Sequence, residues 1–501
     1  MGEDAPLDVL IVGAGLSGIG CGAWLNRRLP GKSWEIIEAR GDLGGTWDLH
    51  RYPGIRSDSD LYTFGFDFKP WRSDKAIAGA AEIMAYLREA AEEEGVAPRI
   101  RYRRRLLRAD WDGDAALWTA TIRDEETGAE ETRRARWLFG ATGYYDYDTP
   151  HRPDFPGEAD FPGPIIHPQL WPEGLDVTGK RIAVIGSGAT AVTLVPALAR
   201  DAAHVTQVQR TPSYILPIPS RDANAERLKR LLPAGLAHRL ARRKNILRQR
   251  VVYALCQRYP ETARKLIRKI NAKMLPEGFD VDAHFNPPYG PWDQRLCAVP
   301  DADFYKAIGS GKASIVTGPI ARLTETGIEM QDGAQVPADL VIAATGLRLQ
   351  LFGGATLSVD GAAVDPATRL VFRGSMLSGV PNFAFAIGYT NSSWTLKIGL
   401  LCEHFTRLLA RMEEVGAAAA MPVAPEGGET RPLMDFGAGY IQRSLHTLPR
   451  RGAAAPWEMN HNYFADEKVF RSGPIDDPAL RFIPARTAAA ARAPAAQETA
   501  A

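Results

Sequence analysis

Cysteine is scarce in this chain of 501 residues. The cysteines are far apart and form no Cys-x-x-Cys or Cys-x-x-x-x-Cys pair: Cys21, Cys256, Cys297 and Cys402. This spacing excludes a redox-active dithiol and a thiolate zinc site. The histidines are equally dispersed, so we expect no metal site from His50, His151, His284, His404 and His461. Isolated thiols are typical of a reducing compartment, which predicts a cytoplasmic protein.

A large net charge and a long apolar run are also missing. The formal net charge is +1, so the composition gives no reason to expect nucleic acid as a partner. The most apolar stretch, "VLIVGAGLSGIGCGAWL", is short and interrupted by glycine, which argues against a membrane span. The acidic start, "MGEDAP", is unlike a signal sequence. With 45% hydrophobic and 24% charged residues, the composition is that of a globular protein, and the length suggests roughly three domains.

A nucleotide-binding pattern opens the chain. The stretch "LDVLIVGAGLSGIG" predicts an apolar strand from Leu7 to Val12, a glycine-rich turn and a helix. A second strand, "SWEIIEA", ends at Glu38, 25 residues after Gly13. In Rossmann-type units the glycines let main-chain N–H groups approach a pyrophosphate, and the acidic residue accepts from ribose hydroxyls. The turn residues expected to border a bound dinucleotide are Gly13, Gly15, Ser17 and Gly18.

The same unit recurs in the middle of the chain. The stretch "KRIAVIGSGATAVTLVPALA" predicts a strand from Arg181 to Ile185, a turn and a helix. Its candidate dinucleotide-binding residues are Gly186, Ser187, Gly188, Thr190 and Ala191. The next strand, "VTQVQRT", ends in Arg210 and Thr211, where an NAD site would offer an acidic residue. A guanidinium there suits the 2′-phosphate of NADPH, so the second site is predicted to bind NADPH.

Paired strand ends indicate how the two units are connected. Residues 137–143, "WLFGATG", and 340–346, "LVIAATG", are buried-type strands that both end in Ala-Thr-Gly. They predict an α/β fold of two nested Rossmann-like domains, in which the second is inserted into the first. The expected parts are the first domain (1–145), a linker (146–178), the inserted domain (179–338) with a helical insertion at about 221–285, the return to the first domain (339–485) and a disordered low-complexity tail (486–501). A long helix is expected after "YTNSSW", with Asn391 or Ser392 as its N-cap.

Two further motifs carry a family resemblance. The linker contains Phe161-x-Gly163-x-x-x-His167-x-x-x-Trp171-Pro172, which matches the fingerprint of type I (class B) flavin-dependent Baeyer–Villiger monooxygenases. In the related flavin N- and S-oxygenases the pattern usually ends in Phe or Tyr. The stretch "GGTWDLHRYPGIRSD" also has the family spacing, at Gly44, Gly45, Trp47, Tyr52, Pro53, Gly54 and Asp58. The resemblance extends to about residue 480, and "YGPWDQRLCAVPDADFYKAI" and "GYTNSSWTLK" are most similar to the subgroup that includes the ethionamide-activating monooxygenase.

The resemblance implies two cofactors, FAD in the first domain and NADPH in the inserted one. The glycines of the first turn would face the FAD pyrophosphate, and Glu38 would hold the adenosine ribose. The residues expected beside the rest of FAD are Gly44, Gly45, Thr46, Trp47 and Asp58. The linker fingerprint would set the relative position of the two domains, and we assign His167 no role as acid or base.

The resemblance also implies a reaction. A flavin C4a-peroxide formed with O2 would attack a ketone, giving an ester or lactone, and would also oxidise sulfides. Because negative charge stays on oxygen, a fixed cation is needed, and the candidate is Arg295 with Asp58 as its orienting partner. Gln294 stands where relatives often carry lysine, so selectivity for NADPH would rest mainly on Arg210 and Thr211. The alternatives are a flavin N- or S-monooxygenase and an NADPH oxidase that makes hydrogen peroxide.

One segment departs from the even charge of the chain. Residues 221–273 contain 16 Lys or Arg and 3 Asp or Glu, and apolar residues recur there at helical spacing. We expect a helical subdomain whose apolar face points inward. The alternative is a surface that contacts anionic lipid or shapes an entry for apolar ketones. The substrate pocket is expected to include Phe285–Trp292 and the segment after Gly388.

Overall fold

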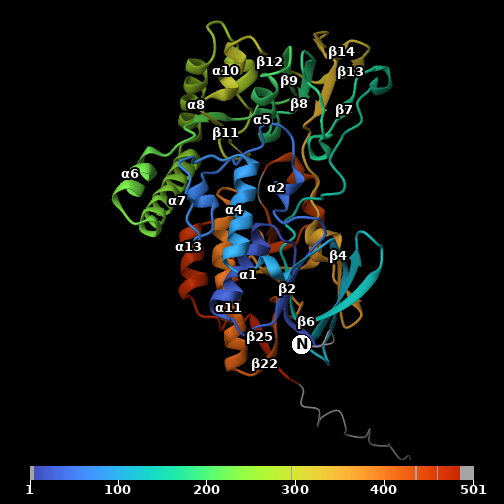
Figure 1. The fold of residues 1–501 in the computed structure, drawn as a ribbon, viewed down its shortest axis with the longest axis vertical. Coiled ribbons are helices and arrows are strands. Elements are labelled where there is room, and N and C mark those ends of the chain that lie inside the picture. The colour runs from blue at the N-terminus through green and yellow to red at the C-terminus, as the bar shows by residue number, and fades with distance from the viewer. Residues whose placement is uncertain (1–4, 295, 435–436, 460, 486–501) are drawn as a thin grey trace, which may run out of the picture.

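The computed structural model describes residues 5–294, 296–434, 437–459 and 461–485. Two α/β units lie one above the other, and a group of helices extends along one side (Figure 1). This arrangement confirms the predicted α/β fold class with nested Rossmann-like domains and a helical insertion. The predicted tail (486–501) and Arg295 lie outside the described residues.

The first unit is built on a mixed sheet in the order β18-β17-β4-β5-β6-β1-β2-β3, with β21 also paired to β6. Its strands are β1 (Leu7–Val12), β2 (Trp34–Glu38), β3 (Ile100–Tyr102), β4 (Arg104–Asp112), β5 (Leu117–Asp124), β6 (Glu130–Gly140), β17 (Thr356–Val359), β18 (Ala362–Ala363) and β21 (Phe383–Phe385). Alternate side chains of β1 enter different cores, Val9 and Ile11 on one face and Leu10 and Val12 on the other. Both faces of the sheet are therefore covered, as in α/β folds.

Helices from both ends of the chain cover this sheet. They are α1 (Leu16–Arg28), α2 (Thr46–Leu49), α3 (Leu61–Phe64), α4 (Ala80–Glu93), α11 (Trp394–Glu414), α12 (Gly439–Gln442) and α13 (Tyr463–Glu467). The long helix α11 packs against α1, so the returning chain completes the first unit. Its N-cap is Ser393, which has extended backbone angles, so the prediction of Asn391 or Ser392 is wrong. Three short strand pairs lie outside the main sheet: β19 (Val371–Phe372) with β20 (Met376–Leu377), β22 (Ala417–Pro422) with β25 (Leu480–Pro484), and β23 (Thr430–Pro432) with β24 (Arg450–Gly452).

The inserted unit has a parallel sheet in the order β12-β9-β8-β16-β7. Its strands are β7 (Ile165–Ile166), β8 (Arg181–Ile185), β9 (His204–Gln209), β12 (Ala313–Thr317) and β16 (Leu340–Ala343). Helices α5 (Ala189–Leu198) and α10 (Asp303–Gly309) share a core with one face. The other face packs on an antiparallel sheet of β13 (Ile320–Thr324), β14 (Gly327–Met330) and β15 (Gln335–Pro337). A separate parallel pair joins β10 (Ile215–Ile218) to β11 (Cys297–Pro300).

Strand pairing differs from the expected domain boundaries at two places. The strand β16 follows the expected boundary at residue 338, yet it pairs with β8 inside the inserted sheet. The strand β7 lies in the predicted linker and pairs with the other side of β16. The boundaries 146–178 and 339–485 therefore need correction, because both cut strands away from the sheet that they belong to.

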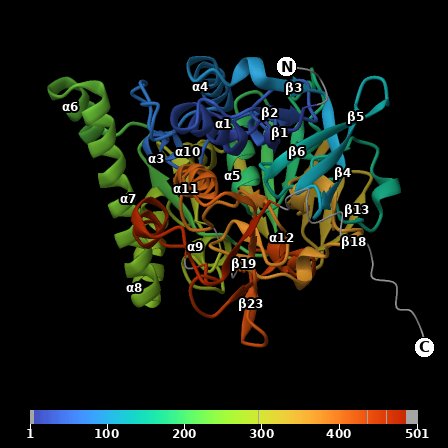
Figure 2. The ribbon, with the colours of Figure 1, turned by 90° about the horizontal axis from the view of Figure 1, so that it is seen from below.

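The basic segment forms a helical arm, defined here as α6 (Ala223–Leu231), α7 (Ala234–Arg258), α8 (Pro260–Met274) and α9 (Val281–Phe285). Helices α6, α7 and α8 run along one flank of the molecule (Figure 2). The expectation of an inward apolar face holds only in part for α7, which buries Ala237, Ala241 and Ile246 but also polar side chains. This helix buries Arg242 and Asn245, whereas Leu240 and Leu247 are exposed. No helix in residues 5–294, 296–434, 437–459 and 461–485 is both long and apolar enough to span a membrane.

Candidate functional site

A cavity of about 1350 Å³ lies between the two α/β units, and both glycine-rich turns border it. The sequence-predicted residues that line it are Gly13, Gly15, Ser17, Glu38, Gly44, Gly45, Thr46, Trp47, Asp58, Gly186, Ser187, Gly188, Thr190, Arg210, Thr211 and Gln294. The predicted site residues outside its wall are Gly18, Ala191, Phe161, Gly163, His167 and Trp171. The first strands of the two motifs end at Val12 and Ile185, 173 residues apart in the sequence, and both following turns border this one cavity.

The first turn follows β1 and requires glycine for two different reasons. Gly13 has a φ of +106°, and a Cβ there would lie 2.7 Å from the carbonyl oxygen of Ala141. A Cβ on Gly18 would overlap the carbonyl oxygen of Gly13. Gly18 therefore lets α1 pack closely on the turn and does not itself face the cavity.

Glu38, at the end of β2, fixes the same turn. Its carboxylate accepts the N–H of Ala14 at 2.7 Å and the N–H of Arg40 at 2.9 Å. Burial raises the pKa of this carboxyl, although the two N–H groups act in the opposite direction. Glu38 also lines the cavity, and each carboxylate oxygen has further acceptor capacity. The side chain can therefore accept from a hydroxyl group bound there.

The "GGTW" segment packs directly on the first turn. A Cβ on Gly45, whose φ is +56°, would lie 3.3 Å from the Cα of Gly15. Thr46 forms a hydrogen bond of 3.0 Å between its hydroxyl and that of Tyr147. The two glycine-rich segments are thus in main-chain contact, and together they form a continuous stretch of backbone in the cavity wall.

The second turn follows β8 and is more open. Gly186 has a φ of +145°, and a Cβ there would overlap the carbonyl oxygen of Ala344. A Cβ on Gly188 would meet no atom within 4 Å, because this glycine faces the cavity. Ala191 is fully buried in α5 and serves packing of the helix on its sheet. The turn thus leaves room for a group to approach the N-terminus of α5.

The "RYPGIRSD" segment of the first unit contacts the inserted unit. A Cβ on Gly54 would lie 2.7 Å from the Cβ of Ala197 in α5. Arg56 forms an ion pair with Asp303 at the start of α10. The segment therefore links the two units through Gly54 and Arg56.

Two other residues of this segment face the cavity. Tyr52 is buried, and its hydroxyl is hydrogen-bonded to Thr190 of the second turn. Burial raises the pKa of Tyr52 to about 12, and the nearby charge of Asp58 acts in the same direction. Asp58 is exposed to the cavity and accepts a hydrogen bond of 3.3 Å from Ser59. The carboxylate thus stands where the two units meet.

The linker fingerprint residues lie outside the cavity wall and contact main-chain groups of other segments. The Nδ1 atom of His167 accepts the N–H of Gln169 at 3.1 Å, so its Nε2 carries the proton and donates to the carbonyl of Gly346 at 3.2 Å. Burial lowers the pKa of His167. Gly163 is required because a Cβ would overlap the carbonyl oxygen of Asp339. Both ring nitrogens of His167 are therefore occupied by hydrogen bonds to the main chain.

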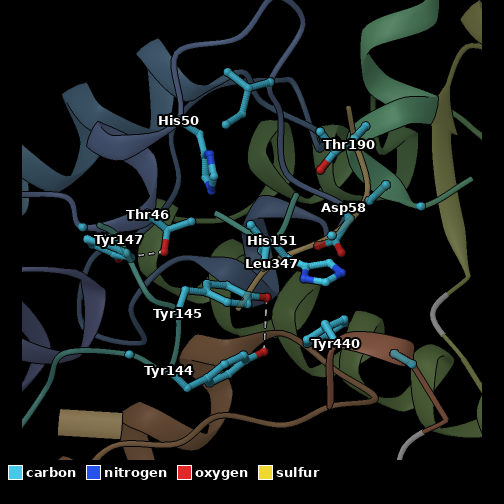
Figure 3. Close-up of a pocket in the computed structure, with 18 of the residues that line it drawn as sticks. Thr46, His50, Asp58, Tyr144, Tyr145, Tyr147, His151, Thr190, Leu347 and Tyr440 are labelled. Carbon is cyan, nitrogen blue, oxygen red and sulfur yellow. Dashed lines mark hydrogen bonds between the residues drawn. The ribbon is translucent and has the colours of Figure 1, made fainter. Parts of the chain in front are cut away.

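Aromatic side chains form a part of the wall that the sequence did not reveal. Tyr145 and Tyr440 lie with ring centroids 6.3 Å apart, and Tyr144 lies 5.1 Å from Trp394. Figure 3 shows the three tyrosines gathered on one side of the space that Asp58 also borders. Of the stretches expected to line the pocket, Tyr289 and residues 392–394 do so.

Two cations also border the cavity. Arg210 follows β9, and Arg443 follows α12 of the other unit. Burial lowers the pKa of Arg443, and the positive charge of Arg210 lowers it further. Among the described residues, neither guanidinium forms an ion pair with a carboxylate. Arg443 was missed by sequence reasoning, because no local motif connects it with Arg210. Two unneutralised cations at one cavity mark a place for an anion.

Some buried polar atoms in the cavity wall have no hydrogen-bond partner among the described residues. The hydroxyl of Ser393 is buried beside the cavity, and it has no hydrogen-bond partner among the described residues. The same holds for Nδ1 of His50, whose pKa is lowered to about 4 mainly by burial. Such atoms normally find partners, so the wall is suited to a polar ligand. Together with the two open backbone turns, these atoms fit a dinucleotide cofactor.

Comparison with known proteins agrees with this geometry. Residues 11–73 match the NAD(P)-binding Rossmann-like domain, and residues 75–352 match the flavin-binding monooxygenase-like family. The chain is 50% identical over 478 residues to the FAD-containing monooxygenase EthA of Mycobacterium tuberculosis, covering 95% of this chain and 97% of EthA. It is 44% identical over 482 residues to the probable FAD-binding monooxygenase AlmA of Acinetobacter baylyi, covering 95% and 96%.

Solved structures share the fold at lower sequence identity. A steroid monooxygenase bound to NADP superposes with a TM-score of 0.73 at 22% identity, covering 96% of this chain and all (100%) of the other. A complex of OTEMO with FAD and NADP superposes with a TM-score of 0.67 at 23% identity, covering 84% and 88%.

The chain belongs to the flavin-binding monooxygenase-like family, since the match to that family covers more than half of it. The prediction of a flavoprotein monooxygenase with FAD and a nicotinamide dinucleotide as cofactors is thereby confirmed.

Proposed function

We propose that this protein is a Baeyer–Villiger monooxygenase that uses FAD, NADPH and O2 to insert one oxygen atom beside a ketone carbonyl. The products are esters or lactones, and sulfides are oxidised at the same site. The observation that carries the proposal is the single cavity bordered by both glycine-rich turns and by Asp58. FAD supplies the redox chemistry, accepting hydride from NADPH and activating O2.

The first unit holds FAD in this proposal. Main-chain N–H groups of the Gly13–Ser17 turn would face the pyrophosphate, and Glu38 would accept from the adenosine ribose. The segment from Gly44 to Trp47 bounds the rest of the cofactor. Asp58 orients the cation that stabilises negative charge on the reacting oxygen. We assign that cation to Arg295 on the sequence resemblance.

The inserted unit holds NADPH. Its pyrophosphate lies against the Gly186–Thr190 turn, where Gly188 leaves the space open. Arg210 and Thr211 contact the 2′-phosphate, and Arg443 supplies the second positive charge that Gln294 lacks. Selectivity for NADPH over NADH thus depends on one arginine from each unit.

The substrate is an apolar ketone. Tyr144, Tyr145, Tyr440 and Trp394 give one side of the cavity an aromatic lining with hydroxyl groups at its edge. The solved structures with this fold include one of cyclohexanone monooxygenase with cyclohexanone bound. We place the activity in the cytoplasm, where the buried free cysteines stay reduced.

The products formed from a mixed panel of substrates test the proposal. The FAD-loaded protein is given NADPH, air and in turn an open-chain ketone, an aryl ketone, a cyclic ketone and a thioether. Ester or lactone formed in proportion to the NADPH consumed supports the proposal. Sulfoxide alone, with ketones untouched, would make the protein a heteroatom oxygenase, and hydrogen peroxide as the only product would make it an oxidase.

A further inference from the structure

The inner face of α7 mixes small or apolar side chains, such as Ala241 and Ile246, with buried polar ones. Arg242 donates three hydrogen bonds of 2.7–3.2 Å to main-chain carbonyls of α3 and the residue after it. Asn245 donates to the carboxylate of Asp60 at 2.9 Å, and Gln249 donates to the same carboxylate at 3.0 Å. The helix is therefore held to the first unit by hydrogen bonds as well as by apolar packing, whereas the inner face of a surface helix is usually apolar.

The outer face of α7 is apolar. Five aliphatic side chains recur along it at intervals of four or seven residues and keep 38–53% of their surface exposed: Leu236, Leu240, Leu247, Val251 and Leu255. In the part of the chain that the structure describes, ten of the fourteen exposed large hydrophobic side chains lie between Leu231 and Met274. Scattered exposed leucines are ordinary, but a concentration of this kind marks an interaction surface.

Positive charge surrounds this apolar stripe. Residues 221–273 hold 16 Lys or Arg and 3 Asp or Glu. Arg239 and Arg248 on α7 and Lys265 and Lys269 on α8 are exposed, and none of them forms an ion pair with another described residue. Arg239 lies between Leu236 and Leu240 in sequence, so cationic and apolar side chains share one outer surface.

We propose that the outer surface of α7 and α8 binds to an anionic lipid membrane. Leucine and valine side chains enter the boundary between headgroups and acyl chains, and the surrounding arginines and lysines contact the lipid phosphates. A second copy of the chain fits this surface less well. In a symmetric dimer the same patch would meet itself, so its positive charges would face one another.

The membrane-binding helix also adjoins the cavity. Gln249, on the inner face of α7, accepts a hydrogen bond of 3.0 Å from Ser392, which lines the cavity. Gln257, further along α7, donates to the carbonyl of Pro291 at 3.4 Å in the loop that carries Tyr289 and Gln294 to the cavity wall. A membrane-bound arm would thus hold the cavity close to apolar compounds dissolved in the lipid.

Vesicle flotation of the full-length, FAD-loaded protein tests the proposal. Vesicles of phosphatidylcholine alone are compared with vesicles that also contain phosphatidylglycerol, at low and at high ionic strength. We expect binding to the phosphatidylglycerol vesicles that weakens in high salt. Arg239→Gln combined with Arg248→Gln should lower the partition coefficient about 25-fold, which is about five-fold for each charge. Leu247→Gln combined with Val251→Gln should lower it by about 100-fold, while the matched control Val423→Gln binds like the parent.

NADPH oxidation without vesicles should be unchanged in all these variants, which shows that they are folded. The proposal is overturned if the parent protein does not float with phosphatidylglycerol vesicles at low ionic strength. It is also overturned if the α7 variants bind vesicles as the parent does. If the parent does not bind vesicles and the α7 variants abolish a dimer of the parent, the surface is a dimer interface and the proposal is likewise overturned.

Discussion

Replacing Arg443 with glutamine should weaken NADPH binding about ten-fold and leave NADH binding unchanged. In the structure Arg443 and Arg210 border one cavity from different units, and neither has a carboxylate partner among the described residues. A charged hydrogen bond contributes about 1.5–3 kcal/mol. Both guanidinium groups are solvent-exposed, so the lower end of that range applies, and it corresponds to about ten-fold. NADH lacks the 2′-phosphate and should not respond.

Initial rates with each cofactor measure this effect. The ratio of KM for NADPH to KM for NADH is determined for the parent, for Arg443→Gln and for Arg210→Gln. The matched control is Arg200→Gln, an exposed arginine of the inserted unit that does not line the cavity. An unchanged ratio in Arg443→Gln, or equal increases in both KM values, would refute the assignment of this arginine to the 2′-phosphate.

Three further predictions concern the turns and the core. Gly18→Ala should lower the free energy of unfolding by about 1–3 kcal/mol and reduce the FAD retained on purification, because the added methyl overlaps the carbonyl oxygen of Gly13. Gly188→Ala should keep FAD and thermal stability and raise only KM for NADPH, since its methyl meets no protein atom within 4 Å; loss of FAD from this variant would contradict the two-site assignment. Burial lowers the pKa of His404 to about 3, and the charge of Arg373 adds to this effect. The unfolded chain gains this proton near pH 6.5 and the folded protein does not, so stability falls as pH falls from about 6.5 toward 3. Between neutral pH and about pH 5, the unfolding free energy of His404→Gln should therefore decrease by about 2 kcal/mol less than that of the parent, as measured by urea denaturation. Equal decreases in the two proteins would show that His404 is not the source of this pH dependence.

Local sequence patterns correctly predicted the first strands of the two strand–turn units that border the cavity. The strand expected from Leu7 to Val12 is β1, and the strand expected from Arg181 to Ile185 is β8. Each is followed by a turn whose glycines are required by positive φ or by close backbone approach, as at Gly13 and Gly186. Such requirements act over a few residues and leave a clear sequence signal.

Long-range contacts explain what the sequence did not reveal. The helical period of α7 shows an apolar stripe, but it does not show which face points inward. That choice depends on Arg242 and Asn245, whose partners lie near Asp60, some 180 residues earlier in the chain. Arg443 and Tyr440 reach the cavity from the returning part of the first unit, and no spacing rule connects them with the glycine-rich turns.

The fate of oxygen in a ketone oxidation tests the central claim most directly. The FAD-loaded protein is incubated with NADPH, isotopically heavy O2, a ketone and catalase, and the product is analysed by mass spectrometry. The account predicts an ester that carries one heavy oxygen atom, formed in proportion to the NADPH consumed. NADPH consumption with no labelled ester from any ketone tested would contradict it.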